Sequence, residues 1–418
     1  MVVDRSTPVH HYSHNRPPSS EGKTMTTRSR FTTRMSAAVL VASFLTLVAC
    51  SDDEETDDNG AGNGDANAAV NTSQVDEDFD LDALIEAAEA EGPITIYDNT
   101  SKVETMAENF TAKYGIEATG VKVDASEAFE MVTREAESGD VQGDVIALPD
   151  MAALQAQLLP DEIVYSWIPG DLVDNIDESQ RDPLVLIHDP SLWAYNSEVY
   201  DTCPVTNMWE LTEEEWTGKV ALEDPVAANK QLDWFSQMEQ FNEADLRAEY
   251  EDHFGEDLDA DSAVEEWVAR MAANDPILTN SHEDVSAAVG APGQEDPPMG
   301  LMSSALFRNI EEQGYVHDVC ADMAPWAGDA APKAMVIASE SENQNAAKLF
   351  IHFALTEEGI EPQINDGKIS SNTTIEQPED PADVRGNMES IYFFNNEGLT
   401  TDWQTRQDWQ DLWRTSAN

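Results

Sequence analysis

The chain has 418 residues, of which 41% are hydrophobic and 25% are charged. This is ordinary globular usage and excludes collagen-like, coiled-coil and polytopic membrane proteins. At about 100 to 200 residues per domain, the length predicts two or three domains. The 83 acidic residues outnumber the 22 basic ones and leave a net charge of −61. Because binding nucleic acid requires lysine and arginine to displace counterions, we expect no nucleic-acid partner.

The N-terminal region has the pattern of an export signal. Three arginines between residues 28 and 34 precede an apolar run over residues 37–49. This run is shorter than the 18 or more apolar residues of a membrane-spanning helix, and a basic flank before a short apolar run is typical of a secretory signal.

The signal ends in Leu-Val-Ala-Cys, which resembles the lipobox of bacterial lipoproteins. The resemblance implies that Cys50 is lipidated and that the signal segment, residues 1–49, is removed. The alternative is an uncleaved anchor that ends at Cys50. Residues 1–24 have no place in such a signal, so we expect translation to begin at Met25.

An acidic stretch follows the signal. Residues 50–80 are rich in Asp, Glu, Asn, Gly and Ala and lack apolar periodicity, so we predict a disordered tether. Without residues 1–49 the chain carries 16 basic and 81 acidic residues. An excess spread so evenly favours an adaptation for solubility or high salt over one cation site.

Two cysteines remain in the body of the chain. Outside the cytoplasm Cys203 and Cys320 either form a disulfide or stay as two buried thiols. The sequence has no CxxC or HExxH pattern and its histidines are isolated, so we predict no metal site and no cofactor.

The body of the chain begins with alternating helices and strands. Apolar spacing predicts helices over residues 81–88, 103–110 and 125–138 and strands over residues 94–97, 116–123 and 144–148. This alternation indicates an α/β class with a parallel sheet. Ligands of such sheets lie where strands end and helices begin, which is where Thr100, Ser101 and Asp150 fall. Alternatively, these three side chains only cap helices.

Further elements follow, with no fixed-period repeat. We expect strands over residues 183–196 and 334–338 and helices over residues 232–238, 264–271 and 345–355. In the tail, Trp409 and Trp413 are four residues apart, which would place both on one helix face that docks on the body.

Three segments resemble the extracellular solute-binding proteins of ABC importers. They are Glu-Gly-Pro-Ile-Thr-Ile-Tyr at residues 91–97, Trp-Thr-Gly-Lys-Val-Ala at residues 216–221, and the helix from residue 345 with the Thr-Glu-Glu-Gly of residues 356–359. Within that family they are similar to the group that includes ferric-iron binding proteins and relatives taking phosphonates, thiamine or hexose phosphates. The resemblance covers residues 81–415.

The resemblance implies a type II periplasmic-binding-protein-like fold with two lobes, hinge strands and a ligand cleft between the lobes. Lobe 1 would comprise residues 81–187 and 333–372, and lobe 2 residues 188–332 and 373–418. The segment from Ile187 to Asn196 would be one hinge crossing. The lobes would close on solute because the ligand contacts both at once.

The resemblance also implies ligand contacts: Thr100, Ser101 and Asp150 in lobe 1, Tyr195 and Asn196 at the hinge, and Asp224 in lobe 2. The alternatives are ordinary strand and turn residues for Tyr195 and Asn196, and a turn before Pro225 for Asp224.

The ligand class depends on one stretch of lobe 2. Iron-binding members coordinate Fe(III) through neighbouring tyrosines, whereas the comparable residues 302–308 contain none. Ser303, Ser304 and Arg308 would suit an oxyanion, so we expect an organic anion such as a sugar phosphate or phosphonate. Small-residue packing is the alternative for the two serines. The alternative functions are a ferric iron-binding importer protein, a secreted enzyme on the same fold and a purely adhesive surface lipoprotein.

No GxSxG elbow, SxxK, P-loop or dinucleotide fingerprint indicates an enzyme, so we expect none. The expected protein is a monomer that delivers a small solute to a permease and ATPase. It would lie in the cell envelope, held by lipid at the outer face of the cytoplasmic membrane, or in the periplasm.

Overall fold

A parallel sheet with crossover helices builds the first part of the structure. The computed structural model describes residues 73–417. Its order begins with β2 (Ile94–Asp98), α2 (Lys102–Tyr114), β3 (Ala118–Lys122), α3 (Ala125–Ser138), β4 (Val145–Leu148) and α4 (Met151–Ala153). β2 pairs in parallel with β3 and β4, which confirms the predicted alternation. Gly115 ends α2 at φ 74°, a left-handed conformation that glycine adopts without steric cost.

The predicted disordered tether is too long at its C-terminal end. β1 (Ser73–Asp76) pairs in parallel with β5 (Val164–Pro169), and α1 (Leu81–Ala88) begins soon afterwards. Between them Phe79 stacks on His352, with ring centroids 5.2 Å apart. Strand pairing and one aromatic contact order this segment without the apolar periodicity that the prediction required. The predicted signal and Cys50 lie outside the described residues.

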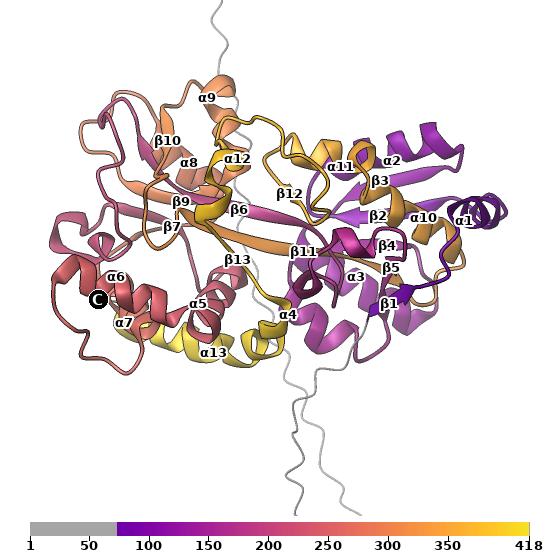
Figure 1. Cartoon of the computed structure of the whole chain (residues 1–418), viewed down its shortest axis with the longest axis horizontal. Helices are drawn as coiled ribbons and strands as arrows, with labels where there is room; N and C mark the ends of the chain where they lie inside the picture. The colour runs from indigo at the N-terminus through magenta and orange to yellow at the C-terminus, as the bar shows by residue number, and fades with distance from the viewer. Residues whose placement is uncertain (1–72, 418) are drawn as a thin grey trace, which may run out of the picture. The chain divides into compact units, whose positions relative to one another are not determined.

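Two long strands connect the two bodies of the fold, as Figure 1 shows. β6 (Val185–Asn196) and β11 (Gly328–Ala338) pair antiparallel over most of their lengths. β11 also pairs with β4 and β5, while β6 pairs with β9 (Met299–Ser303) and β10 (His317–Val319). The expected hinge crossing therefore lies within β6, and β11 is a second one.

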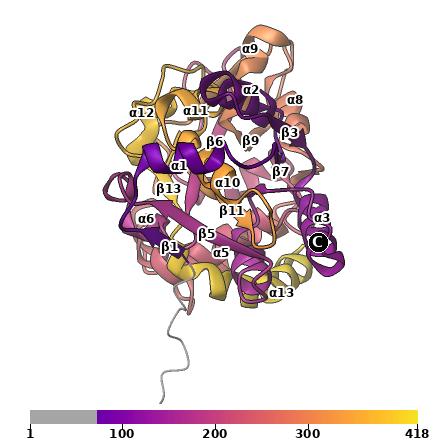
Figure 2. The same ribbon diagram turned by 90° about the vertical axis from the view of Figure 1, so that its right-hand side faces the viewer.

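The first lobe is the body built on β2 to β5. α10 (Gln344–Ala354) and α11 (Glu357–Ile364) return to it from β11, and α1 packs on α10. Figure 2 faces this lobe and shows α1, α2 and α10 in front of its strands. Its apolar core gathers side chains from both chain segments, such as Phe110 and Phe350.

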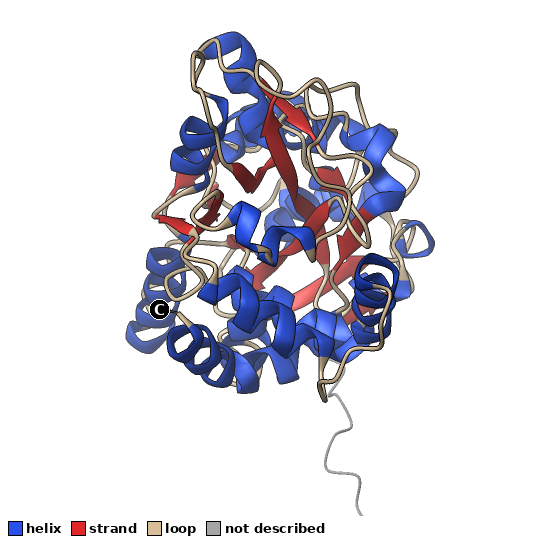
Figure 3. Ribbon diagram, turned by 90° about the vertical axis from the view of Figure 1, so that its left-hand side faces the viewer, coloured by secondary structure: helices blue, strands red, loops and turns tan. Residues whose placement is uncertain are grey.

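The second lobe is built on β7 (Val220–Glu223), β8 (Ile277–Thr279) and β9. Its helices are α5 (Asn229–Phe241), α6 (Glu243–Phe254), α7 (Ala263–Ala273) and α8 (His282–Gly290). Figure 3 faces this lobe, where the helices surround the strands. Cys203 and Cys320 are joined in a disulfide at the edge of its tryptophan-rich core.

The path of paired strands through both lobes is β3-β2-β4-β11-β6-β9-β7-β8. The shorter elements are α9 (Asn309–Glu312), β12 (Ile369–Ser370), α12 (Val384–Asn387) and β13 (Ile391–Phe393). The residue boundaries that we predicted for the two lobes stay a prediction.

The tail ends in α13 (Leu399–Ser416), which packs on α5 and α7 of the second lobe. The Trp409 and Trp413 rings each lie 6.1 Å from the ring of Phe235, which confirms the expected docking. Among residues 73–417, no helix combines the length and the apolar character needed to cross a membrane.

Candidate functional site

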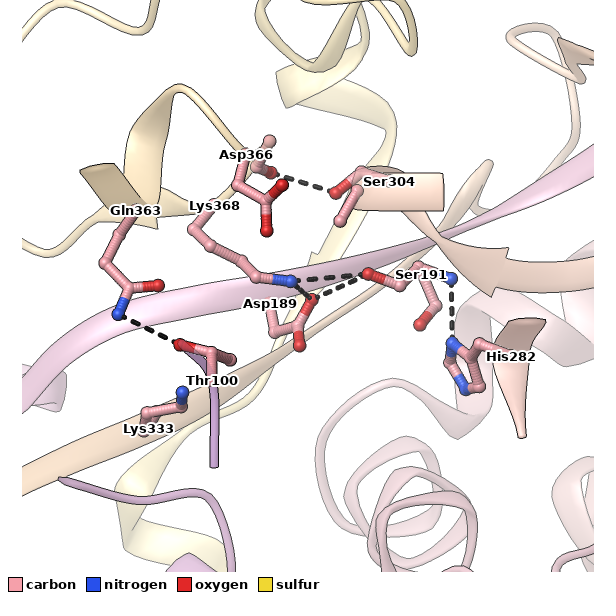
Figure 4. A network of polar contacts seen from close by, with 12 residues as sticks. Thr100, Asp189, Ser191, His282, Ser304, Lys333, Gln363, Asp366 and Lys368 are labelled. Atoms are coloured by element: carbon pink, nitrogen blue, oxygen red, sulfur yellow. Dashed lines mark hydrogen bonds and ion pairs between the residues drawn. The ribbon is translucent and has the colours of Figure 1, made fainter. Parts of the chain in front are cut away.

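Three lysines lie against the crossing strands, each paired with an aspartate. The first is Lys368, from the loop after α11. Its Nζ lies 2.5 Å from Oδ1 of Asp189 on β6 and 3.3 Å from Oγ of Ser303 at the end of β9 (Figure 4). Although burial opposes ionisation, the ammonium groups of Lys368 and Lys230 hold the pKa of Asp189 below its usual range. The Asp189 side chain stays 35% exposed and can therefore meet a ligand.

The second lysine, Lys230, comes from the first turn of α5 in the second lobe. Its Nζ donates to Oγ of Ser191 at 2.6 Å and lies 3.0 Å from Oδ1 of Asp329 on β11. Burial raises the pKa of Asp329, and Lys230 opposes that rise. The Lys230 side chain is 24% exposed, so this ammonium group can reach solute.

The third lysine, Lys333 on β11, forms a fully buried ion pair. Its Nζ lies 2.8 Å from Oδ1 of Asp98, and the two side chains are 2% and 1% exposed. Asp98 ends β2 and also accepts from Nε2 of Gln363 at 3.0 Å and from the backbone N–H of Thr100 at 3.2 Å. This pair therefore fixes the first strand-to-helix turn against the hinge.

The turn holds two of the predicted contacts. The Thr100 hydroxyl lies 3.3 Å from Oδ2 of Asp98 and 3.5 Å from Nε2 of Gln363 (Figure 4). Thr100 therefore belongs to what we call the lysine network, which is the three Lys–Asp pairs and the side chains bonded to them. Ser101 occupies the N-cap of α2 without capping it through its side chain, and it is exposed. The capping role that we considered for Ser101 is therefore absent.

The end of β9 brings Ser303 into the same network. Its hydroxyl donates to Oδ1 of Asp189 at 3.1 Å, and its backbone N–H donates to Nδ1 of His282 at 2.7 Å. Nε2 of that histidine lies 3.0 Å from Glu223 of β7. Ser304 is buried and donates to the carbonyl of Gly367 at 2.9 Å, so it ties the second lobe to the loop after α11.

Four predicted contacts lie outside the lysine network. The Tyr195 hydroxyl donates to Asp318 at 3.2 Å, and the buried amide of Asn196 donates to the carbonyl of Val289 at 2.8 Å. Asp224 accepts from the backbone N–H of Val226 at 2.9 Å, as a turn residue does. Arg308 is 41% exposed and bonds the carbonyl of Ala305 at 2.8 Å.

Asp150 lies at a contact between the lobes. It caps α4 by accepting from the backbone N–H of Ala153 at 3.0 Å, so the capping role that we considered is present. It also bonds Asn229 of α5 at 3.2 Å and the guanidinium of Arg406 of α13 at 2.6 Å. Asp150 therefore joins α4 of the first lobe to two helices packed on the second.

A cavity of about 550 Å³ opens beside these residues, and we call it the cleft. Both lobes line it, with α3 and α4 on one side and the start of α5 with α13 on the other, over residues 331–332 of β11. Lys230 and Asp150 both face it. The cleft thus adjoins the lysine network through Lys230.

A second buried cluster forms the far wall of the cleft. Arg406, 10% exposed, pairs with Asp150 and Asp233, both at 2.6 Å. Burial raises the pKa of Asp233 to about 6 against the effect of Arg406. Burial and the nearby Asp233 raise the pKa of Asp402 to about 7.

Ammonium and carboxylate groups alternate across the hinge, which suits a ligand that has both an anionic group and hydroxyl groups. Ammonium groups bind oxyanions, and carboxylates accept from hydroxyl groups. Within residues 73–417 no three His, Cys, Asp or Glu side chains form a group that could hold a metal ion. No sequence pattern singled out Asp189, Lys230, Lys333 or Lys368, although the scarcity of basic residues after residue 49 was a usable signal for the three lysines.

Two lobes, two crossing strands and a cleft between the lobes define a type II periplasmic-binding-protein fold. The sequence model of the bacterial extracellular solute-binding proteins matches residues 105–386, and the chain belongs to that family. This confirms the resemblance seen in the sequence. The chain is therefore a solute-binding protein of the kind that serves ABC importers.

Solved structures share this fold at low sequence identity. Iron-bound HitA of Pseudomonas aeruginosa has a TM-score of 0.59 at 13% identity, with 78% of this chain and 100% of that chain covered. The open ferric iron-binding protein A of Mannheimia haemolytica has a TM-score of 0.60 at 14% identity, covering 78% and 100%.

AfuA of Actinobacillus pleuropneumoniae, with fructose-6-phosphate bound, has a TM-score of 0.57 at 19% identity, covering 77% and 99%. No curated protein matches the chain in sequence.

Proposed function

We propose that this solute-binding protein captures a hydroxylated organic anion, such as a sugar phosphate or phosphonate, where the cleft adjoins the lysine network. The observation that supports this proposal most strongly is that three Lys–Asp pairs each have a residue on a hinge strand, in a chain that is otherwise strongly acidic. Lys230 and Lys368 would take the anionic group, and Asp189 would accept from a hydroxyl. AfuA, with its bound sugar phosphate, supports this reading by likeness of fold.

Ferric iron is the second candidate, because other proteins of the same fold bind it. Phenolate oxygen is the hard anionic ligand that such a cation prefers. Here the stretch 302–308 at the end of β9 has no tyrosine, and the Tyr195 hydroxyl is engaged by Asp318. The three lysines also place ammonium groups at the hinge, and an ammonium group donates hydrogen bonds to an anion and has nothing to offer a cation.

Titration calorimetry with glucose 6-phosphate, fructose 6-phosphate, a phosphonate, thiamine and Fe(III)-citrate tests the proposal. We expect one-to-one binding of a phosphorylated or phosphonate solute. We also propose that the protein is not an enzyme, so NMR should recover that solute unchanged after long incubation. Tight binding of iron alone would contradict the proposed anionic solute. Formation of a product would contradict the proposal that the protein is not an enzyme.

Replacing Lys368 with methionine should weaken binding of glucose 6-phosphate at least tenfold. A charge-assisted hydrogen bond is worth about 1.5–3 kcal/mol, and about 1.4 kcal/mol is tenfold in affinity. Lys230→Met should act similarly. Lys348→Met, on α10 with its ammonium group over Trp167, is the matched control and should leave affinity unchanged. Equal affinity in all three variants would show that neither Lys230 nor Lys368 binds the anion.

We propose that lipid on Cys50 holds the protein at the outer face of the cytoplasmic membrane. There it would serve a permease and ATPase as a monomer. Labelled fatty acid should enter the wild-type protein and not Cys50→Ala, whose purified form should bind the same solute. Labelling of both forms alike would exclude this anchor.

A further inference from the structure

A second cavity, of about 440 Å³, lies behind the hinge, and we call it the rear cavity. His188 of β6 lines it, and successive residues of a strand point to opposite faces, so it lies across β6 from Asp189. Its other walls come from residues 177–180, residues 369–377 and β13. It shares no lining residue with the cleft.

Four lining side chains carry buried polar atoms that lack a hydrogen-bond partner within residues 73–417. The atoms are Oε1 of Gln180, Nδ1 of His188, Oγ of Ser371 and Nε2 of Gln377. Their residues are 8%, 4%, 5% and 8% exposed. A buried polar group without a partner costs about 1–3 kcal/mol, so four around one cavity indicate a surface built to meet a polar guest.

The local structure holds two of these groups in place. The Gln180 amide nitrogen donates to the carbonyl of Phe394 at 3.1 Å, which leaves Oε1 free to accept. The Ser371 backbone N–H donates to the carbonyl of Leu186 at 3.1 Å, which sets this residue beside β6. The polar groups are therefore positioned before any ligand arrives.

The buried polar groups of the lining carry no charge. Burial lowers the pKa of His188 to about 4, so its ring is neutral at physiological pH, and the serine and glutamines carry no charge. Asp177 on the lining is exposed and ionised, since hydrogen bonds from Ser179 lower its pKa, and it repels anions. The glutamines present one acceptor and one donor, and a ligand hydroxyl can satisfy both.

An apolar wall completes the site. The Phe393 ring lies 5.1 Å from the His188 ring, and Ile369 and Ile375 also line the cavity. Cavities of about 300–1,000 Å³ with mostly apolar walls and a few fixed polar groups are typical of small-molecule sites. The carbon face of a polyol would pack on this wall while its hydroxyl groups reach the polar atoms.

We propose that the rear cavity is a second binding site, which takes a small uncharged polyhydroxylated molecule, a polyol or an uncharged sugar. It is independent of the anion site, from which its chemistry and lining residues differ. Because it lies against a crossing strand, its occupant contacts the hinge directly.

Calorimetry and thermal melting of the full chain with sorbitol, myo-inositol and glucose test this site. We expect saturable one-to-one binding of at least one probe and a higher melting temperature in its presence. Ser371→Ala with Gln377→Leu should weaken that binding at least tenfold while affinity for glucose 6-phosphate is unchanged. Gln155→Leu removes another buried unpartnered amide oxygen, from a residue that lines neither cavity, and should bind the probe normally.

Lys230→Met separates the two sites, because it changes only the cleft. Probe binding that survives in this variant supports the proposal, and probe binding that is lost there would place the molecule in the cleft. A crystal structure at saturating sorbitol keeps the test decisive if the double variant misfolds. Density for sorbitol beside Ser371 and Gln377 is expected, and ordered water alone would overturn the proposal.

Discussion

Replacing Lys333 with methionine should lower the free energy of unfolding by about 3–5 kcal/mol, as removal of one partner from a buried ion pair does. Methionine fills a similar volume but leaves the Asp98 carboxylate unpaired in a site where both side chains are at most 2% exposed. Urea unfolding monitored by tryptophan fluorescence measures the loss.

Two further variants isolate the cause. Lys122→Met changes an exposed lysine on β3 and should alter the free energy of unfolding by less than about 0.5 kcal/mol. Adding Asp98→Asn to Lys333→Met should restore part of the loss, because the buried charge is gone. Equal stability of the Lys122 and Lys333 variants would show that the pair is not structural.

Arg406→Met should be comparably destabilising. Its guanidinium pairs with both Asp233 and Asp150. Without it, Asp233 is left buried without its cation, which costs about 3–5 kcal/mol. Arg414→Met, on the same helix but half exposed, is the matched control and should have little effect.

The stability that Arg406→Met loses relative to wild type should also depend on pH. The folded pKa of Asp233 is already raised to about 6, and losing the cation raises it further. A carboxyl whose pKa is raised on folding stabilises the fold fully below its unfolded pKa, near 4, and this stability is lost as pH rises through the folded pKa. Wild type and variant lose this stability in parallel up to about pH 6, and the deficit of the variant should therefore grow from there to pH 8. A deficit that shrinks over that range would contradict this account.

Local patterns were enough to predict most of the first lobe. The strands and helices from Ile94 to Leu148 follow one another with short turns, so apolar spacing within each element locates it. β1 escaped prediction because it is ordered by pairing with β5, about ninety residues away, and its own sequence is polar. The first half of β11 was missed because Asp329, Pro332 and Lys333 interrupt the apolar pattern of that strand.

The site was harder to predict than the fold. Thr100 and Asp150 follow strands that apolar spacing predicted, whereas Ser303 ends a strand that it did not predict. All three reach the cleft or the lysine network. Asp189, Lys230 and Lys368 come from a hinge strand, a helix start and a loop, and no spacing in the sequence links them. The two lysines share one signal, which is that basic residues are scarce in this chain, whereas Asp189 is one of many acidic residues and has no signal of its own.

The acidic exterior does not argue against an anionic solute. Exposed charges are screened over roughly 8–10 Å at physiological salt, whereas partly buried pairs are screened much less. Lys230 and Lys368 are 24% and 4% exposed, so their hydrogen bonds to a solute would be screened less than the charges of the surface. High salt would weaken repulsion by the surface further, and the site would keep its affinity.

A crystal structure of the protein with glucose 6-phosphate tests the central claim most directly. We predict phosphoryl oxygens within hydrogen-bond distance of the Nζ atoms of Lys230 and Lys368 and a sugar hydroxyl donating to Asp189. Sugar phosphate bound away from the hinge strands, or a cleft that takes only iron, would contradict the account.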